Sequence, residues 1–213
     1  MREVTLIITS CDRTDLLKKT FNSIVSTNTY PIKKYIIIED SGKIGINDFI
    51  KKDYPNLNID LVYNNPKLGQ LESIDKVYSM VNTEYIFHCE EDWEFYKSGY
   101  IEYSFKILDS NPKILSCWLR DDTDTNGMPI EKDYVIHENI SYRLMSKNYR
   151  GVWHGFTLNP TLIRVSDYNL VKPYSQYKEE HLISIKYNDL GFSSAKCDGG
   201  FVKHIGWGRH VTT

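Results

Sequence analysis

The sequence lacks the features that most quickly assign a protein to a class. Its four cysteines are widely spaced and form neither a CxxC pair nor a Cys/His zinc pattern, which is typical of reduced thiols in a reducing compartment. An excess of one charge is also missing, because 26 basic and 28 acidic side chains give a net charge of −2 and no electrostatic attraction for nucleic acid or an anionic membrane. No apolar run is long enough to span a bilayer, and no signal-peptide core follows Met1. These absences predict a soluble, cytoplasmic protein that binds small molecules.

What the sequence does contain is an alternation of strand-like and helix-like segments, clearest in the first half. Such βαβ units form a parallel sheet with right-handed crossovers. A polar, turn-rich excursion at 120–132 and a short predicted hairpin at 135–146 interrupt the second half. The predicted strands are 4–10, 34–39, 59–63, 85–89 and 114–119, and the predicted helices are 14–26, 46–53, 71–81, 100–109 and 179–190. No Gly/Ser-rich linker or internal repeat divides the chain, so we predict one α/β domain over 1–213 with a mixed, mostly parallel central sheet flanked by helices.

Three consecutive acids, Glu90, Glu91 and Asp92, end the apolar run YIFHC. Adjacent carboxylates repel one another unless a cation or a set of donors lies among them, and oxygen ligands of this kind suit a divalent metal. The acids also follow a predicted strand, at the edge of the sheet where open α/β folds bind ligands. The alternative interpretation is a solvated loop whose charges face water.

Polar residues follow the other predicted strands as well. Thr9 and Ser10 end the first strand, where their donors can meet a base or a ribose, and Arg13 begins the next helix. Asp40 ends the second strand, either as a ligand-binding carboxylate or as a plain Asx turn before a glycine. In the loop after the third strand, Lys67 offers a cation for phosphate and Gly69 allows close approach of the backbone.

Taken together, these motifs resemble the GT-A glycosyltransferases of the broad family-2 type. The resemblance is carried by ITSCDR, IIEDSG, an Asn-x-x-x-x-Gly loop and CEED in the first half, and by EEHLISIKYNDLGF and HIGWG in the second. Within that group the chain is similar to the small glycosyltransferase domains of large algal (chlorella) viruses, which would place it in a host cytoplasm. The resemblance implies a GT-A fold, with a nucleotide-binding half at 1–95 and an acceptor-binding half with a C-terminal lid at 96–213.

The resemblance also implies roles for the first-half residues. Thr9 and Asp40 would hold a uracil ring, and Arg13 would approach the base or the diphosphate. The acids stand at the position of the DxD motif, so that Glu90 would bind the ribose and Asp92 a Mn²⁺ or Mg²⁺ ion, with Glu91 open between the two. Glu90 departs from the usual aspartate, and Ile74 replaces a basic residue that family members often carry, so Lys67, Lys76, the metal or the C-terminal tail must neutralise the diphosphate.

In the second half, the resemblance implies a late metal ligand and a catalytic base. His204 is the expected metal ligand, with His210 in reserve, although a lone histidine is often only structural. Glu179 and Glu180 occupy the place of the family's ED motif, whose second acid is the base, although acids also simply favour a helix N-terminus. The other expected contacts of the second half are Arg209 and Lys203 with phosphate, Trp153 and His154 with sugar or acceptor, and a lid formed by Gly206, Trp207 and Gly208.

The leading hypothesis is thus a metal-dependent, inverting glycosyltransferase that moves a sugar from a UDP-sugar to a hydroxyl of a carbohydrate or glycoprotein acceptor. A nucleotidyltransferase is the first alternative, but it would want a glycine-rich loop after the first strand, and TSCDRTD lacks glycine. The second alternative is a non-catalytic sugar- or nucleotide-binding module on the same fold.

Overall fold

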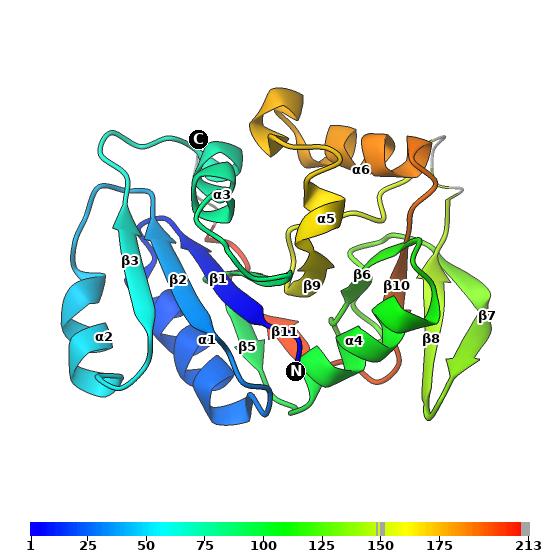
Figure 1. The fold of residues 1–213 in the computed structure, drawn as a ribbon, viewed down its shortest axis with the longest axis horizontal. Helices are drawn as coiled ribbons and strands as arrows, with labels where there is room; N and C mark the ends of the chain where they lie inside the picture. The colour runs from blue at the N-terminus through cyan, green and yellow to red at the C-terminus, as the bar shows by residue number, and fades with distance from the viewer. Residues whose placement is uncertain (148, 150–151, 210–213) are drawn as a thin grey trace.

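The computed structural model describes residues 1–147, 149 and 152–209. Its largest sheet has five strands in the order β3-β2-β1-β4-β9 (Figure 1). The first four of these strands are parallel, and only β9 runs antiparallel to its neighbour β4. These strands are β1 (Val4–Ser10), β2 (Lys34–Glu39), β3 (Ile59–Tyr63), β4 (Tyr85–Glu90) and β9 (Thr161–Arg164). The predicted α/β fold with a mostly parallel sheet is confirmed.

Helices cover both faces of this sheet, which explains why its central strands read as unbroken apolar runs. Leu6 and Ile8 of β1 pack in one cluster with α1 (Thr14–Thr27) and α2 (Ile46–Asp53). Ile7, which points to the opposite face, packs instead in a cluster with α3 (Gln70–Tyr78). Figure 1 shows α1 and α2 on one side of the sheet and α3 on the other.

The second half forms a four-stranded sheet in the order β6-β10-β8-β7, and its strand β11 pairs with β5, at the end of the first half, in a small two-stranded sheet. Its helices are α4 (Tyr100–Ser110), α5 (Val165–Tyr168) and α6 (Glu180–Asp189), with a short 3₁₀ helix at Tyr174–Tyr177. The strands are β5 (Trp93–Phe95), β6 (Ile114–Trp118), β7 (Ile130–His137), β8 (Ile140–Met145), β10 (Ser193–Cys197) and β11 (Val202–His204). No helix among the described residues combines the length and apolar character needed to cross a membrane.

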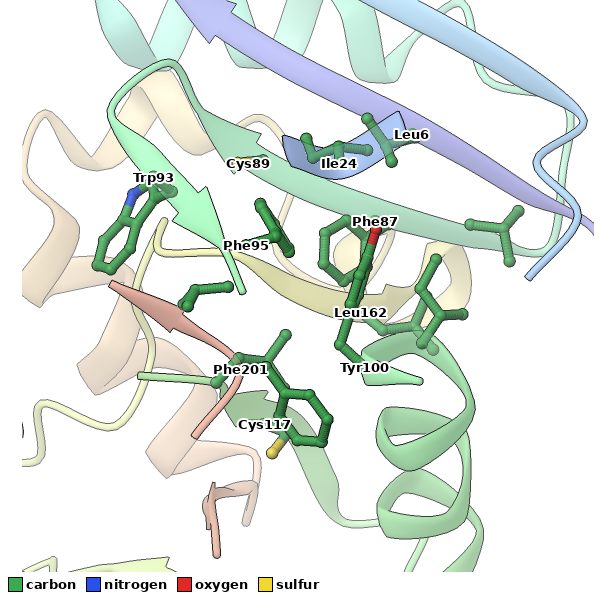
Figure 2. Packing of buried hydrophobic residues seen from close by; sticks show 14 of the residues in the cluster. Leu6, Ile24, Phe87, Cys89, Trp93, Phe95, Tyr100, Cys117, Leu162 and Phe201 are labelled. Carbon is green, nitrogen blue, oxygen red and sulfur yellow. The ribbon is translucent and has the colours of Figure 1, made fainter. Parts of the chain in front are cut away.

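One hydrophobic cluster joins the two halves. Phe87 of β4 and Phe95 of β5 both pack against the ring of Tyr100, at centroid distances of 5.2 and 4.7 Å. Figure 2 shows these three rings in the middle of the cluster and Trp93 at its end. Because β5 directly follows the acids at 90–92, this packing fixes the backbone that carries them.

Several segment boundaries differ from the sequence-based predictions. The helix predicted at 71–81 ends at Tyr78, and residues beyond it form turns. The hairpin predicted at 135–146 is longer, because β7 already begins at Ile130 within the segment that was predicted to be irregular. Strands β5, β9, β10 and β11 were not predicted at all.

Candidate active site

A pocket of about 380 Å³ opens at the carboxyl ends of β1, β2 and β4. This is the edge of the sheet where the sequence predicts a ligand site. Most of the predicted site residues line it, namely Thr9, Ser10, Arg13, Asp40, Lys67, Gly69, Glu90, Glu91, Asp92 and His204. The remaining four, Trp153, Glu179, Glu180 and Arg209, are not among the described residues that line it.

Ser10 and Thr9 reach the pocket from the end of β1, where both are buried. The Ser10 hydroxyl donates to Glu39 Oε2 at 2.7 Å, and Glu39 Oε1 accepts the backbone N–H groups of Asp12 and Ser41 at 2.9 and 3.0 Å. Glu39, which the sequence did not single out, therefore fixes the turns after both β1 and β2. The Ser10 hydroxyl proton is used in this network.

Asp40 ties down the loop after β3. One carboxylate oxygen accepts the Asn64 side-chain amide and the Leu68 backbone N–H, both at 2.8 Å, and the other accepts the Gly69 N–H at 2.9 Å. Gly69 has a φ of 102°, a conformation that favours glycine. Lys76 lies behind this loop and donates to Asn64 Oδ1 at 2.6 Å rather than lining the pocket. Asp40 thus makes long-range bonds instead of the local Asx turn that was the alternative.

The first acid, Glu90, accepts hydrogen bonds from two side chains at the rim. Gln70 Nε2 lies 2.8 Å from one oxygen and Trp93 Nε1 lies 3.4 Å from the other. Burial raises the pKa of Glu90 well above its ordinary value, and the negative charges of Asp92, Glu180 and Glu91 add to the effect.

The middle acid, Glu91, faces Arg13. Its carboxylate accepts from Arg13 Nε at 2.8 Å and from the Cys11 backbone N–H at 3.1 Å, and the residue is 4% exposed. Burial raises the pKa of Glu91, against the opposing effect of the guanidinium. Glu91 lines the pocket and anchors Arg13, and its contact with ribose or metal stays a prediction.

The last acid, Asp92, is where the two ends of the chain meet. Its Oδ2 lies 2.8 Å from Arg13 Nη1 and 3.1 Å from His204 Nε2, and its Oδ1 is buried without a hydrogen-bond partner. Burial alone would raise the pKa of Asp92, but the hydrogen bond to His204 and the charge of Arg13 outweigh it and lower the pKa. A Cβ on Gly206 would lie 2.4 Å from Asp92 Oδ2, so only glycine lets the backbone pass this close.

Asp92 and His204 fit a divalent ion as a partial ligand set. No group of three or more His, Cys, Asp and Glu residues within the described part of the chain could hold a metal by itself. Two buried polar atoms of this pair, Asp92 Oδ1 and His204 Nδ1, nevertheless lack partners. A carboxylate and an imidazole together suit Mn²⁺, which would take its other ligands from a diphosphate and water.

The segment after β11 folds back over the first half. His204 packs between the rings of Trp93 and Trp207, and Trp207 is 63% exposed at the pocket rim. Arg209 makes a bidentate ion pair with Asp15 at the start of α1, at 2.7 and 2.9 Å, which lowers the pKa of Asp15 to about 2. Arg209 is therefore held beside the pocket rather than in it. His210, the reserve metal ligand, lies outside the described residues.

Glu179 and Glu180 stand at the start of α6. Glu179 is exposed and lies 3.0 Å from His181 Nδ1. Glu180 is exposed as well. Its carboxylate accepts the Leu158 backbone N–H at 3.0 Å, and partial burial of this carboxyl by the surrounding protein raises its pKa. Glu180 lies near enough to Glu90 for its charge to raise the pKa there, although it does not line the pocket.

Trp153 is a core residue, contrary to its predicted contact with sugar. Its side chain is 2% exposed and belongs to the cluster around Tyr174 and Tyr187. A Cβ on Gly155 would lie 2.0 Å from the Trp153 ring, which shows how closely the backbone covers it. A ring this buried has no open face for a ligand. Its neighbour His154 packs against Tyr149 and His181 and does not line the pocket.

The pocket also contains polar residues that the sequence analysis missed. Gln70 begins α3, Arg120 lies two residues after the end of β6, and Asn126 and Asn159 come from loops of the second half. Arg120 could have been found by the rule that singled out the acids, because it too stands at the carboxyl end of a strand. The two asparagines carry no comparable signal, since their loops have no regular pattern.

Solved structures similar to this fold include complexes with nucleotide-sugars. The mannosyltransferase PcManGT from Pyrobaculum calidifontis, in complex with GDP-Man and Mn2+, superposes with a TM-score of 0.67 at 10% identity, over 93% of this chain and 55% of that one. S. aureus TarS 1-349 in complex with UDP-GlcNAc gives a TM-score of 0.66 at 12% identity, over 99% and 62%. A longer S. aureus TarS structure gives 0.67 at 12%, over 94% and 36%. The chain thus spans less than two thirds of each, and at such low identity the likeness shows a shared GT-A-like fold.

Sequence comparison is more specific about the family than about a single relative. No curated protein sequence matches the chain. None of these comparisons supports the similarity to algal-virus domains. The profile of the family described as Glycosyl transferase family 2, however, matches residues 5–169, which include β1, the acids after β4 and β9. The chain therefore belongs to glycosyl transferase family 2.

Proposed function

We propose that this chain transfers a sugar from a nucleotide-sugar, a UDP-sugar in the first instance, to a hydroxyl group of a carbohydrate or glycoprotein acceptor. The observation that carries the proposal is the convergence of Asp40, Asp92 and His204 on one pocket at the carboxyl ends of β1, β2 and β4. Asp40 and His204, the first and last of these three residues, are 164 positions apart in the sequence. A pocket with few, converging polar groups is the usual form of a small-molecule site.

The first half supplies the donor contacts. One carboxylate oxygen of Asp40, which accepts the Gly69 N–H, retains capacity to accept a further hydrogen bond from a uracil N–H. Glu90, whose pKa is raised, and Gln70 border the place expected for the ribose. Lys67 lines the pocket next to Gly69 and supplies positive charge for the phosphates.

Asp92 and His204 are the residues that would hold the divalent ion. A bound Mn²⁺ or Mg²⁺ would act as a Lewis acid that neutralises charge on the departing nucleoside diphosphate. Asp92 contacts both His204 and Arg13. Together they lower the pKa of Asp92 and so favour its ionised form. Arg13 is itself held in place by Glu91, so the middle acid acts by positioning a cation.

Glu180 is the proposed base. An inverting transfer needs a group that takes the proton from the acceptor hydroxyl as its oxygen attacks the anomeric carbon. The raised pKa of Glu180 makes its carboxylate a better proton acceptor, and one hydrogen bond from the Leu158 N–H fixes its orientation. Glu179 is bound to His181, whereas Glu180 has the raised pKa, which favours Glu180 over its neighbour.

Calorimetric titration with UDP, GDP and CMP tests the donor site. Each nucleotide is added with Mn²⁺ and with a chelator, to the wild type and to Asp92→Ala. GDP belongs in this set because GDP-Man and UDP-GlcNAc both occur in similar folds. We expect metal-dependent binding of UDP that Asp92→Ala removes. Absence of binding by all three nucleotides would overturn the proposal, and release of pyrophosphate rather than UDP during turnover would favour a nucleotidyltransferase.

A further inference from the structure

Arg120 is a buried cation that the roles above leave unused. It lies two residues after the end of β6 and is 4% exposed. Its guanidinium lies over the ring of Trp93, 4.9 Å from the centroid, and its Nε donates to Asp124 Oδ2 at 2.9 Å. The stacking fixes the plane of the guanidinium and the hydrogen bond fixes its rotation within that plane.

The two terminal amino groups of Arg120 point to a ligand. No residue in the described part of the chain accepts a hydrogen bond from them, although a guanidinium has five N–H donors. The two amino groups are not fully buried, and Arg120 lines the pocket, so they are accessible from it. A fixed guanidinium with its two amino groups free presents the planar fork that binds carboxylate or phosphate in a bidentate manner.

The acids of the pocket do not use this fork. Glu91 and Asp92 are both bound by Arg13, and Glu90 accepts from Trp93, the ring on which Arg120 stacks. Asp124 takes only the Nε proton. A buried charge with unpaired donors is costly, and an oxyanion from a ligand would remove that cost.

The position of Arg120 places the fork beside the proposed reaction centre. Trp93 contacts Arg120, and it also packs against the ring of His204 at 5.0 Å. The backbone of Arg120 pairs with Val202, two residues before His204. A ligand group bound by Arg120 would therefore lie next to the metal ligands.

We propose that Arg120 binds an oxyanion of the substrate, either the diphosphate of the nucleotide or a carboxylate on the sugar that it carries. This inference rests on the proposed function, because it assumes that a nucleotide-sugar occupies the pocket. It adds a specificity-determining residue from the second half of the chain. It also predicts that a hexuronic acid donor gains affinity from Arg120 if the fork reaches the sugar rather than the phosphate.

The test compares binding by the wild type, Arg120→Gln and Arg120→Lys. Calorimetric titrations use UDP, UDP-glucose and UDP-glucuronate, each with Mn²⁺. Loss of a bidentate charged contact should weaken binding about 10- to 100-fold. Weaker binding of all three ligands would identify the diphosphate as the oxyanion, and weaker binding of UDP-glucuronate alone would identify the sugar carboxylate. Unchanged binding of all three would overturn the proposal.

Two controls separate this inference from folding and from the proposed function. Arg143→Gln removes a guanidinium that stacks on Tyr134, 5.1 Å from the ring centroid and outside the pocket, and should leave binding unchanged. If Arg120→Gln does not fold, Arg120→Lys decides, because it keeps the charge and the aliphatic stem but not the fork. If the wild type binds no nucleotide, the proposed function fails, and titration with pyrophosphate and glucuronate still tests Arg120. Equal binding of these anions by wild type and variant, or none by either, would overturn the inference.

Discussion

Asp92 connects the first half of the chain with the segment around β11. It accepts from Arg13 of the first half and lies against His204 near the end of the chain, and its carbonyl accepts the Ile205 backbone N–H at 2.8 Å. The close passage of Gly206 makes these contacts possible, since any side chain there would meet the carboxylate. Residue 206 is therefore a glycine because the Asp92 carboxylate lies so close to its backbone.

Gly206→Ala should therefore impair metal-dependent binding. A Cβ placed 2.4 Å from Asp92 Oδ2 must move the carboxylate or the segment that carries His204. We expect Mn²⁺-dependent affinity for nucleotide to fall about tenfold or more, as for loss of a charged contact, with binding measured by calorimetry. Gly45→Ala is the control, because a Cβ there meets nothing within 4 Å. If Gly206→Ala binds nucleotide with wild-type affinity, the backbone at residue 206 does not lie this close to Asp92 in solution.

For single residues, the sequence predicted which ones lie at the pocket better than it predicted the contacts of their side chains. The strand-end rule and the family resemblance placed Thr9, Asp40 and Asp92 at one edge of the sheet, and the pocket contains all three. The rule could not separate Glu91 from its neighbours, because three consecutive acids at a turn have no alternation that says which one faces inward. The burial of Trp153 could not be predicted, because it depends on residues distant in the sequence that belong to the same cluster, among them Tyr174 and Tyr187.

Strand β4 is the element that carries the acids, and it contains an unusual buried histidine. His88 is 1% exposed, and neither ring nitrogen has a hydrogen-bond partner. Burial lowers its pKa to about 3. The ring packs edge-on against Tyr78 of α3, at 5.8 Å between centroids, so neutral His88 acts as part of the core.

His88 should make the folded state less stable as the pH is lowered. Below its ordinary pKa of 6.5 the unfolded chain binds a proton at His88, whereas the folded chain stays neutral down to about 3. The unfolded state therefore binds more protons in this window, and His88 should cost up to about 1.4 kcal/mol of unfolding free energy for each pH unit that the solution is acidified. Urea unfolding of the wild type and His88→Phe at about pH 5 and about pH 8 measures the difference.

The control for this prediction is His137→Phe, which removes a partly exposed histidine of β7. It should keep the pH dependence of the wild type, whereas His88→Phe should reduce it. Equal pH dependence in the wild type and in His88→Phe would mean that His88 acquires a proton, or a water partner, in the folded state.

Among the elements, the regular βαβ units were predicted with bounds close to those observed, and the short strands were not. Strands β1 and β2 combine β-branched content with burial on both faces, a signal that is local in the sequence. Strand β10, with the sequence SSAKC, has no such signal and is a strand because β6 and β8 lie on either side of it. Strands β5 and β11 have three residues each and depend on pairing with one another across about a hundred residues.

At the scale of the whole molecule, the proposed site needs both halves of the chain. The donor residues stand at the ends of β1, β2 and β4, whereas Glu180 comes from α6 and Arg120 from the loop after β6. The end of the chain returns to the first half through the pairs His204–Asp92 and Arg209–Asp15. Figure 1 shows α6 above the second sheet, across from the strands of the first half.

This division between the halves predicts that donor binding and turnover separate in variants of Glu180. Glu180→Gln should leave the Kd for UDP with Mn²⁺ near the wild-type value, because the residue is outside the donor pocket. Its kcat, measured as UDP release with a panel of sugar acceptors, should fall about 10²- to 10⁴-fold, the usual contribution of a general base. In the wild type kcat should decline as the pH falls through the raised pKa of Glu180, because the protonated carboxyl cannot accept a proton. Glu179→Gln is the matched control and should keep both kcat and this pH dependence; turnover of Glu180→Gln at the wild-type rate would exclude Glu180 as the base.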